Sequence, residues 1–206
     1  MIQTVIRTSP SRYNHTTPSP VRLHTNNSVS PISTRRLSGS LLLSPSFISS
    51  EIESYKGDIL DNKPHGRGIC TYKSGYKYEG EFNLGLKHGF GTLKSSNGES
   101  IYSGDWELGK FQGDGIFINP LYEPNFRDEN DLEYENLSNL TKNWVRFEGG
   151  FFEGKMNDLG TLHFFNGEKF RGKFVNGRVN GEGSYYKNSG DIIMGFWENG
   201  ILQEIF

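Results

Sequence analysis

The residues of this sequence that could do chemistry are a glycine-rich stretch, two histidines and a pair of glutamates. Gly85–Gly91 reads GLKHGFG, and its three glycines surround a lysine as in loops that bind phosphate. A phosphate loop also needs a preceding strand, a Gly-Lys-Ser/Thr sequence and a following helix, whose amides and dipole hold the anion. Gly85–Gly91 lacks these features and its spacing recurs along the chain, so we predict a structural role.

The histidines and carboxylates do not form a recognisable reactive group. His65 and His88 occupy equivalent places about 10 Å apart in neighbouring structural units, which is too far to share one metal ion. Glu79 and Glu81 lie on a polar strand face, and the sequence places no nucleophile or base beside them. The single cysteine, Cys70, has no partner for an internal disulfide. We therefore expect no catalytic residue, no metal, no cofactor and no enzymatic activity.

A repeat of about 23 residues must position all of these residues. Each segment opens on an aromatic or aliphatic residue, with glycine at the third place, a large apolar residue at the fifth, and further glycines near the eighth, twelfth and fourteenth. The six segments begin at Tyr55, Tyr78, Tyr102, Phe147, Phe170 and Ile193. Departures are local: Asn62 replaces the eighth glycine in the first segment, Asp158 replaces a turn glycine in the fourth, and the sixth stops halfway.

Within a segment, apolar residues at the first, third and fifth places alternate with polar ones, which is typical of a half-buried strand. Glycines at the eighth and twelfth places predict a tight loop with positive φ, followed by a second strand through the thirteenth to eighteenth places. Each segment is then a β-hairpin, and stacked hairpins give an all-β fold, an elongated single antiparallel sheet that advances about 10 Å per repeat.

Stretches such as YEGEF, GLKHGFGTL and FRGKFVNGRVNGEGSY resemble the MORN (membrane occupation and recognition nexus) repeat. The resemblance runs from Tyr55 to about Gly200. It implies a scaffold or targeting module, because MORN arrays occur at membrane contacts and in ciliary and cytoskeletal proteins. Family members are described as binding phosphoinositides or gripping a partner peptide in an aromatic groove, and any enzyme among them is a separate domain.

Our first hypothesis is a scaffold that binds a partner peptide or helix along an aromatic groove of the sheet. The alternative for each ring is that it only packs against its neighbours. The groove residues are Tyr78, Phe82, Tyr102, Trp106, Phe147, Phe151, Phe170, Phe174 and Trp197.

The second hypothesis is a peripheral membrane module, because the ninth or tenth place is basic in five segments. In register, such residues form a cationic edge that could meet anionic phospholipids at up to about 1 kcal/mol per charge. The alternative is that they only keep the edge soluble. The headgroup candidates are Lys63, Lys87, Lys110, Lys155 and Arg178.

Residues 1–50 differ from the repeats in composition, which divides the chain into a tail and a MORN-repeat domain over 51–206. The tail is rich in Ser, Thr and Pro and has five arginines and no acid, so we expect it to be disordered. An unmodified basic tail and a mitochondrial presequence are the alternatives to a phosphorylated one. The candidate phosphorylation sites are Ser9, Thr17, Ser19, Ser30, Ser38 and Ser44.

An insertion at about residues 119–146 interrupts the third repeat and carries six acids. We expect it to loop out of the sheet with a short helix at Asp131–Leu140, and to contact a partner or fold over the groove. The apolar C-terminal end predicts an open edge that allows a homodimer.

Formal charge indicates which partners to expect. The total is −2, so residues outside the tail carry about −7, which disfavours nucleic acid. The sequence has no run of about 18 apolar residues. We expect a cytoplasmic location, at the cytoskeleton, at a cilium or on the cytoplasmic face of a membrane.

Overall fold

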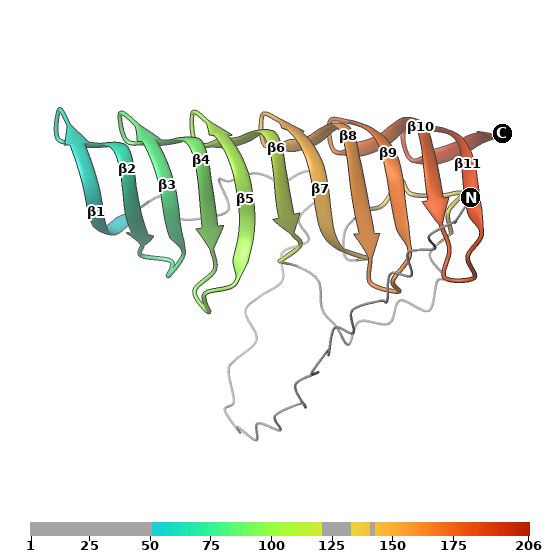
Figure 1. The fold of residues 1–206 in the computed structure, drawn as a ribbon, viewed down its shortest axis with the longest axis horizontal. Coiled ribbons are helices and arrows are strands. Elements are labelled where there is room, and N and C mark those ends of the chain that lie inside the picture. Colours follow the sequence, from blue (N-terminus) through green and yellow to red (C-terminus); the bar gives the residue numbers. More distant parts are fainter. Residues whose placement is uncertain (1–50, 121–132, 141–142) are drawn as a thin grey trace, which may run out of the picture. The chain divides into compact units, whose positions relative to one another are not determined.

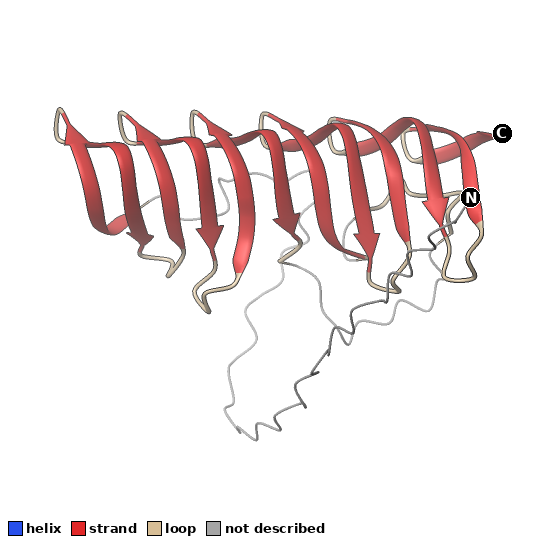
Figure 2. Cartoon of the chain, in the orientation of Figure 1, coloured by secondary structure: helices blue, strands red, loops and turns tan. Residues whose placement is uncertain are grey.

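The computed structural model describes residues 51–120, 133–140 and 143–206, all of which belong to one compact unit. They form one antiparallel sheet of twelve strands, in which the order of strands across the sheet is their order along the chain (Figure 1). No helix occurs among these residues (Figure 2). The predicted fold class is confirmed, whereas the predicted tail and its phosphorylation sites lie outside the described residues. The strands are β1 Ile52–Leu60, β2 Lys63–Tyr72, β3 Lys77–Asn83, β4 Leu86–Lys94, β5 Ser100–Glu107, β6 Lys110–Ile118, β7 Trp144–Phe152, β8 Lys155–Phe164, β9 Lys169–Val175, β10 Arg178–Tyr186, β11 Ile192–Glu198 and β12 Ile201–Ile205.

Each repeat is a hairpin closed by a two-residue turn at its seventh and eighth places. Both turn residues have positive φ, for example 48° at Leu84 and 91° at Gly85. This is the type I′ arrangement, whose twist matches that of the flanking strands. The prediction of a loop from the eighth to the twelfth place was wrong: the second strand begins at the ninth place. The glycine at the twelfth place does have positive φ, 54° at Gly89, but it forms a bulge within β4.

A row of glycines crosses the sheet from β1 to β11. Glycines at the third and fourteenth places face one another at every strand contact, as Gly80 faces Gly91 and Gly91 faces Gly104. A Cβ atom built at Gly91 would overlap the Tyr78 ring, because that ring lies directly on the glycine backbone. The row therefore makes room for the first aromatic residue of each repeat. Its members are Gly57, Gly68, Gly80, Gly91, Gly104, Gly115, Gly149, Gly160, Gly172, Gly183 and Gly195.

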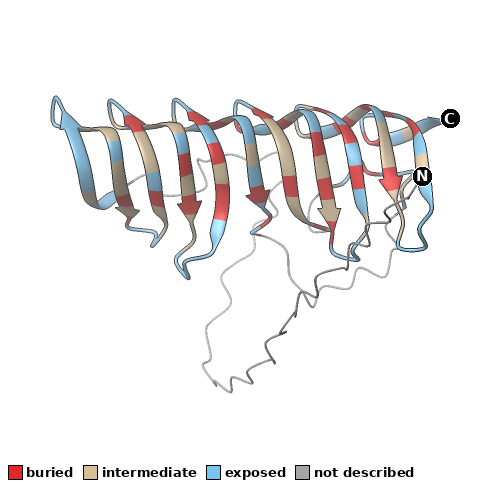
Figure 3. Cartoon of the chain, in the orientation of Figure 1, coloured by how far each residue is buried: buried red, intermediate tan, exposed pale blue. Residues whose placement is uncertain are grey.

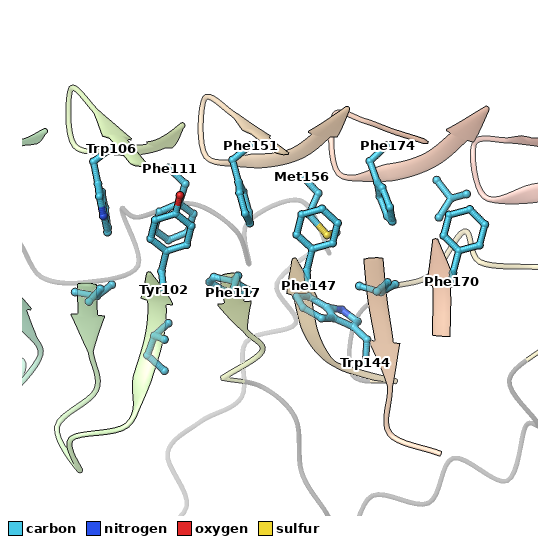
Figure 4. Packing of buried hydrophobic residues seen from close by; sticks show 14 of the residues in the cluster. Tyr102, Trp106, Phe111, Phe117, Trp144, Phe147, Phe151, Met156, Phe170 and Phe174 are labelled. Carbon is cyan, nitrogen blue, oxygen red and sulfur yellow. The ribbon is translucent and has the colours of Figure 1, made fainter. Parts of the chain in front are cut away.

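The hydrophobic core lies between the bodies of the strands and the hairpin ends, which bend over the same face (Figure 4). Apolar side chains at the fifth and tenth places, such as Trp106 and Phe111, hang from the hairpin ends and meet those at the first and sixteenth places, such as Tyr102 and Phe117. Tyr102 contacts Trp106 and Phe151 edge to face, with ring centroids 5.1 and 5.3 Å apart. Such pairs contribute about 0.5–1.5 kcal/mol beyond the area that they bury. The single sheet thus encloses a core between two layers of side chains, one on the strand bodies and one on the hairpin ends.

Burial is uneven along the array (Figure 3). The middle strands alternate buried and exposed residues, as in β5 and β9. In β1 every residue is exposed except Tyr55, which is partly buried. Because each hairpin is covered by its neighbours, a strand at the end of the array is buried on one side only.

The glycine row gives a first prediction. Gly91→Ala should lower the free energy of unfolding by about 1–3 kcal/mol, because the new Cβ has to displace the Tyr78 ring from a packed core. Gly98→Ala is the control, since a Cβ there meets nothing within 4 Å and costs only the strain of its φ of 88°. Urea unfolding measures both variants. A Gly91→Ala chain as stable as the wild type would show that the rings do not depend on the glycine row.

Candidate interaction surfaces

The glycine-rich stretch Gly85–Gly91 forms the turn and the first residues of β4, with no helix after it. Gly85 belongs to the turn, Gly89 to the bulge and Gly91 to the glycine row. No cluster of His, Cys, Asp or Glu side chains suited to a metal ion occurs in the part of the chain that the structure describes. Nor does any helix there reach the length and apolarity that crossing a membrane requires.

The nine predicted groove rings all lie in the core, with at most 4 % of each side chain exposed. They form a continuous series of edge-to-face contacts along the array, for example between Tyr78 and Trp106 and between Phe147 and Phe174. Tyr78 also donates a hydrogen bond to the carbonyl of Glu81 at 3.0 Å. The rings therefore stabilise the sheet, and their contact with a partner stays a prediction. The nine are Tyr78, Phe82, Tyr102, Trp106, Phe147, Phe151, Phe170, Phe174 and Trp197.

Four of the five basic candidates form an exposed row along the hairpin ends. Each is the first residue after a turn, and backbone hydrogen bonds keep successive turns in line: Gly109 N donates to Lys87 O at 3.0 Å, and Gly154 N to Phe111 O at 2.9 Å. Lipid binding by this row stays a prediction. Its members are Lys63, Lys110, Lys155 and Arg178.

Lys87 does not belong to this row. It stands at the tenth place, where Phe111, Met156 and Val179 are buried core residues of other repeats. Its Nζ lies over the rings of Tyr72 and Trp106, 5.0 and 5.2 Å from their centroids. Burial lowers the pKa of Lys87 below its usual range, because the charged ammonium loses water. The predicted place of Lys87 among the headgroup residues is corrected: the ammonium points inward, into an aromatic cage.

A surface at the C-terminal end of the array holds part of the insertion. The sequence predicted a homodimer edge there and placed Trp197 in the groove, but it did not predict which residues of the insertion lie against this end. There residues 133–140, part of the insertion between β6 and β7, form a turn at Tyr134 and Glu135 and then an irregular path, rather than the expected helix. Leu137 N donates to Gly200 O at 2.6 Å, and Leu202 N donates to Glu135 O at 2.8 Å. Asn136 thereby forms a bridge with Ile201. The insertion therefore pairs with the last hairpin.

Side chains add to this pairing. The Trp197 indole Nε1 donates to Tyr134 O at 2.9 Å, and Leu137 is 1 % exposed. The Tyr134 ring packs on Tyr185, with centroids 5.9 Å apart, and Lys187 Nζ lies 4.2 Å from the centroid of the Tyr134 ring. We call Tyr185, Lys187, Trp197, Gly200 and Leu202 the C-terminal docking surface.

Comparison with protein families agrees with the repeat geometry. The model of the MORN repeat matches residues 55–75, 78–100, 102–120, 147–169 and 170–192, which together exceed half of the chain. The chain belongs to the MORN repeat family. The MORN repeat is a non-catalytic repeat type, and MORN repeats serve in protein binding and membrane binding. The hairpin of β11 and β12 follows the last matched MORN repeat and continues its geometry.

Similar proteins carry MORN-like stretches within longer chains. Human Alsin is 40 % identical over 68 residues, which is 31 % of this chain and 4 % of Alsin. The inactive protein tyrosine kinase pTKL of Plasmodium berghei is 30 % identical over 128 residues, 57 % of this chain and 10 % of that protein. MORN repeat-containing protein 3 of Xenopus laevis is 38 % identical over 69 residues, 31 % of this chain and 29 % of that protein. The chain thus spans a small part of these relatives.

The half-buried Lys87 gives a second prediction. Lys87→Met should raise the free energy of unfolding at pH 7 by on the order of 1 kcal/mol, because methionine fills the same place in the fourth repeat without a charge to desolvate. The lowered pKa means that the folded chain releases this proton at a lower pH than the unfolded chain does. The free energy of unfolding of the wild type should therefore rise relative to that of the variant as the pH rises toward the usual lysine pKa, about 10.4.

Urea unfolding of both chains from pH 7 to 10 measures this difference. A wild type that is the more stable chain at pH 7 would show that attraction between the ammonium and the rings outweighs desolvation. Lys63→Met is the control at an exposed lysine and should leave stability nearly unchanged.

Proposed function

We propose that this MORN array is a non-catalytic scaffold that binds a segment of a partner protein along the ring face of its sheet. The observation that carries the proposal is the seating of residues 133–140 on the last hairpin. This segment makes a turn in which Asn136 N donates to Glu133 O at 2.9 Å, pairs with the hairpin through its backbone and buries one leucine, as a bound peptide does. A surface that accepts one segment of its own chain can accept a similar segment of another chain.

The buried rings limit how such a partner can bind. Because the rings are buried in the core, a partner has to contact the margins of the ring face. The partly buried residues there are Tyr55, Tyr76, Ile193 and Leu202. These residues pack against the core and keep some surface toward solvent. Contact at the margin leaves the core intact, which suits a scaffold that is folded before it binds.

Photo-crosslinking in cells tests which face meets the partner. A photoreactive phenylalanine at Ile193 should crosslink a defined protein, whereas the same residue at Met194 should not, because neighbouring strand residues point to opposite faces. Tyr55 and Lys56 form the same kind of pair at the other end of the array. Mass spectrometry identifies the adducts. Adducts from Met194 and Lys56 alone would place the partner on the opposite face and reject the proposal.

A second candidate function is binding to an anionic membrane surface through the hairpin ends. The observation that favours it is a pair of exposed leucines at turn tips, Leu84 and Leu108, which are 49 % and 66 % exposed. Both have positive φ, where Asn176 stands in the fifth repeat. Leucine in this conformation costs about 1–2 kcal/mol and gains nothing from burial. Exposed leucines beside Lys63 and Lys110 are suited to the boundary between headgroups and acyl chains.

Flotation with vesicles of phosphatidylcholine and phosphatidylserine tests this candidate. The wild type should float and should be released by salt. Replacing both Leu84 and Leu108 by Asn should weaken binding at least about tenfold, since two leucines leave the membrane, while the fold keeps or gains stability. Reversing the charge of the basic row, at Lys63, Lys110, Lys155 and Arg178, should abolish binding. Failure of the wild type to float, or unchanged binding by the Asn variant, rejects the role of the tips.

The predicted homodimer through the C-terminal end also stays a proposal. Ile205 and Phe206 are exposed, which supports pairing at this edge. The beginning of β12 is already paired with residues 135–137, so only the later part of the strand is open to a second copy.

A further inference from the structure

We propose that the C-terminal docking surface is a peptide-binding site for a segment that forms a turn, with a tyrosine in the turn and a leucine three residues later, and that residues 133–140 occupy it as a built-in competitor. The inference rests on the proposed scaffold function and names the ligand and the regulation of one part of its ring face. A partner would gain this site only by displacing the insertion.

The position of the site in the array explains why it exists. In earlier repeats the outer side of each hairpin is covered by the following turn, whose glycine N–H bonds to a tenth-place carbonyl: Gly177 N donates to Met156 O, and Gly200 N to Val179 O. No described residue forms a further hairpin after β12. Residues 135–137 lie against this last hairpin instead, where Leu202 N donates to Glu135 O. The insertion thus supplies backbone contacts to the hairpin of β11 and β12.

Recognition at the site combines backbone and side-chain contacts. The partners of Gly200, Leu202 and the Trp197 indole are all backbone atoms of the segment, so other peptides that form the same turn can supply them. Selectivity comes from Tyr134, which lies against Tyr185 and Lys187, and from Leu137, which is fully enclosed. A peptide with an aromatic residue and a leucine at the same separation fits both places.

Close approach at Gly200 fixes where the peptide backbone lies. A Cβ built at Gly200 would be 2.6 Å from the backbone of Leu137 and of Ser138. Gly109 holds the same turn position with a similar φ, 80° against 86°, but a Cβ there meets nothing within 4 Å. Alanine at these two glycines therefore carries the same backbone strain, and only the change at Gly200 closes the peptide site.

The seated segment is suited to exchange. Of its eight residues, Glu133, Glu135, Asn136, Ser138 and Asn139 are exposed, and only Leu137 is buried. Ordering eight residues costs conformational entropy that one buried leucine and a few hydrogen bonds offset only in part. Its tether to the sheet supplies a high effective concentration, which makes it a competitor without making it tightly bound.

The test uses the peptide EYENLSNL, residues 133–140, labelled with fluorescein, and measures its anisotropy with the full chain. In a linker variant, glycine and serine replace residues 133–140 at equal length. The peptide should bind the linker variant at least about tenfold more tightly than the unaltered chain, where the tethered copy competes. A peptide with alanine in place of Tyr134 and Leu137 should not bind.

Two further variants locate the binding. Gly200→Ala added to the linker variant should abolish binding, and Gly109→Ala should leave it unchanged. Absence of binding to a linker variant with a native circular dichroism spectrum overturns the proposal, as does binding that survives Gly200→Ala or equals that of the unaltered chain. Should the linker variant not fold, the folded Leu137→Ser chain takes its place, with the same outcomes.

This experiment is independent of the search for a cellular partner. Peptide binding together with the absence of ring-face crosslinks would reject the proposed scaffold function but keep the site. Crosslinks at Ile193 without peptide binding would keep the scaffold and reject the competitor.

Discussion

The contact between an aromatic ring and the bare backbone of a glycine is the constraint on which the rest of this MORN sheet depends. The Tyr78 ring lies where a Cβ of Gly91 would be, and the same arrangement recurs with Tyr102 and Gly115 and with Phe170 and Gly183. Because the rings lie low on the strands, the hairpin ends can bend over them and add a second layer of rings. A sheet with one ring face thereby encloses a core without help from helices or a second sheet.

The enclosure is mainly local, because each described hairpin in the middle of the array packs against its two neighbours. A departure in one repeat is therefore tolerated by the others. Lys87 places a charge among Tyr72, Tyr78 and Trp106, and the rings compensate through their electron-rich faces. The ends of the array differ for the same reason: β1 is exposed, and the last hairpin is covered by the insertion. At the C-terminal end of the array, the insertion takes a place against the last hairpin that a neighbouring repeat takes in the middle.

The sequence alone predicted the features that recur at the same place in every repeat. Alternation of apolar and polar residues identified the strands, and the 23-residue period identified the hairpins and their single sheet. It did not predict how the hairpin ends bend, because a period of two is the same in a flat strand and in a folded one. Lys87 was misplaced for this reason: one step from the ninth to the tenth place turns a side chain from solvent into the core. The seating of Leu137 was missed because it is a tertiary contact across 63 residues of sequence with no periodic signal.

The burial of the rings changes where recognition can occur in such an array. A flat sheet would offer its aromatic face to a partner, but here the hairpin ends already use that face as a core. What remains is the margin of the ring face, the row of hairpin tips with Leu84 and Leu108, and the end of the array at Gly200. Each of these offers backbone groups or isolated side chains rather than a broad apolar groove. A partner would then bind without changing the core. Its affinity would have to come from a few side chains and from backbone hydrogen-bonding groups that are already in place.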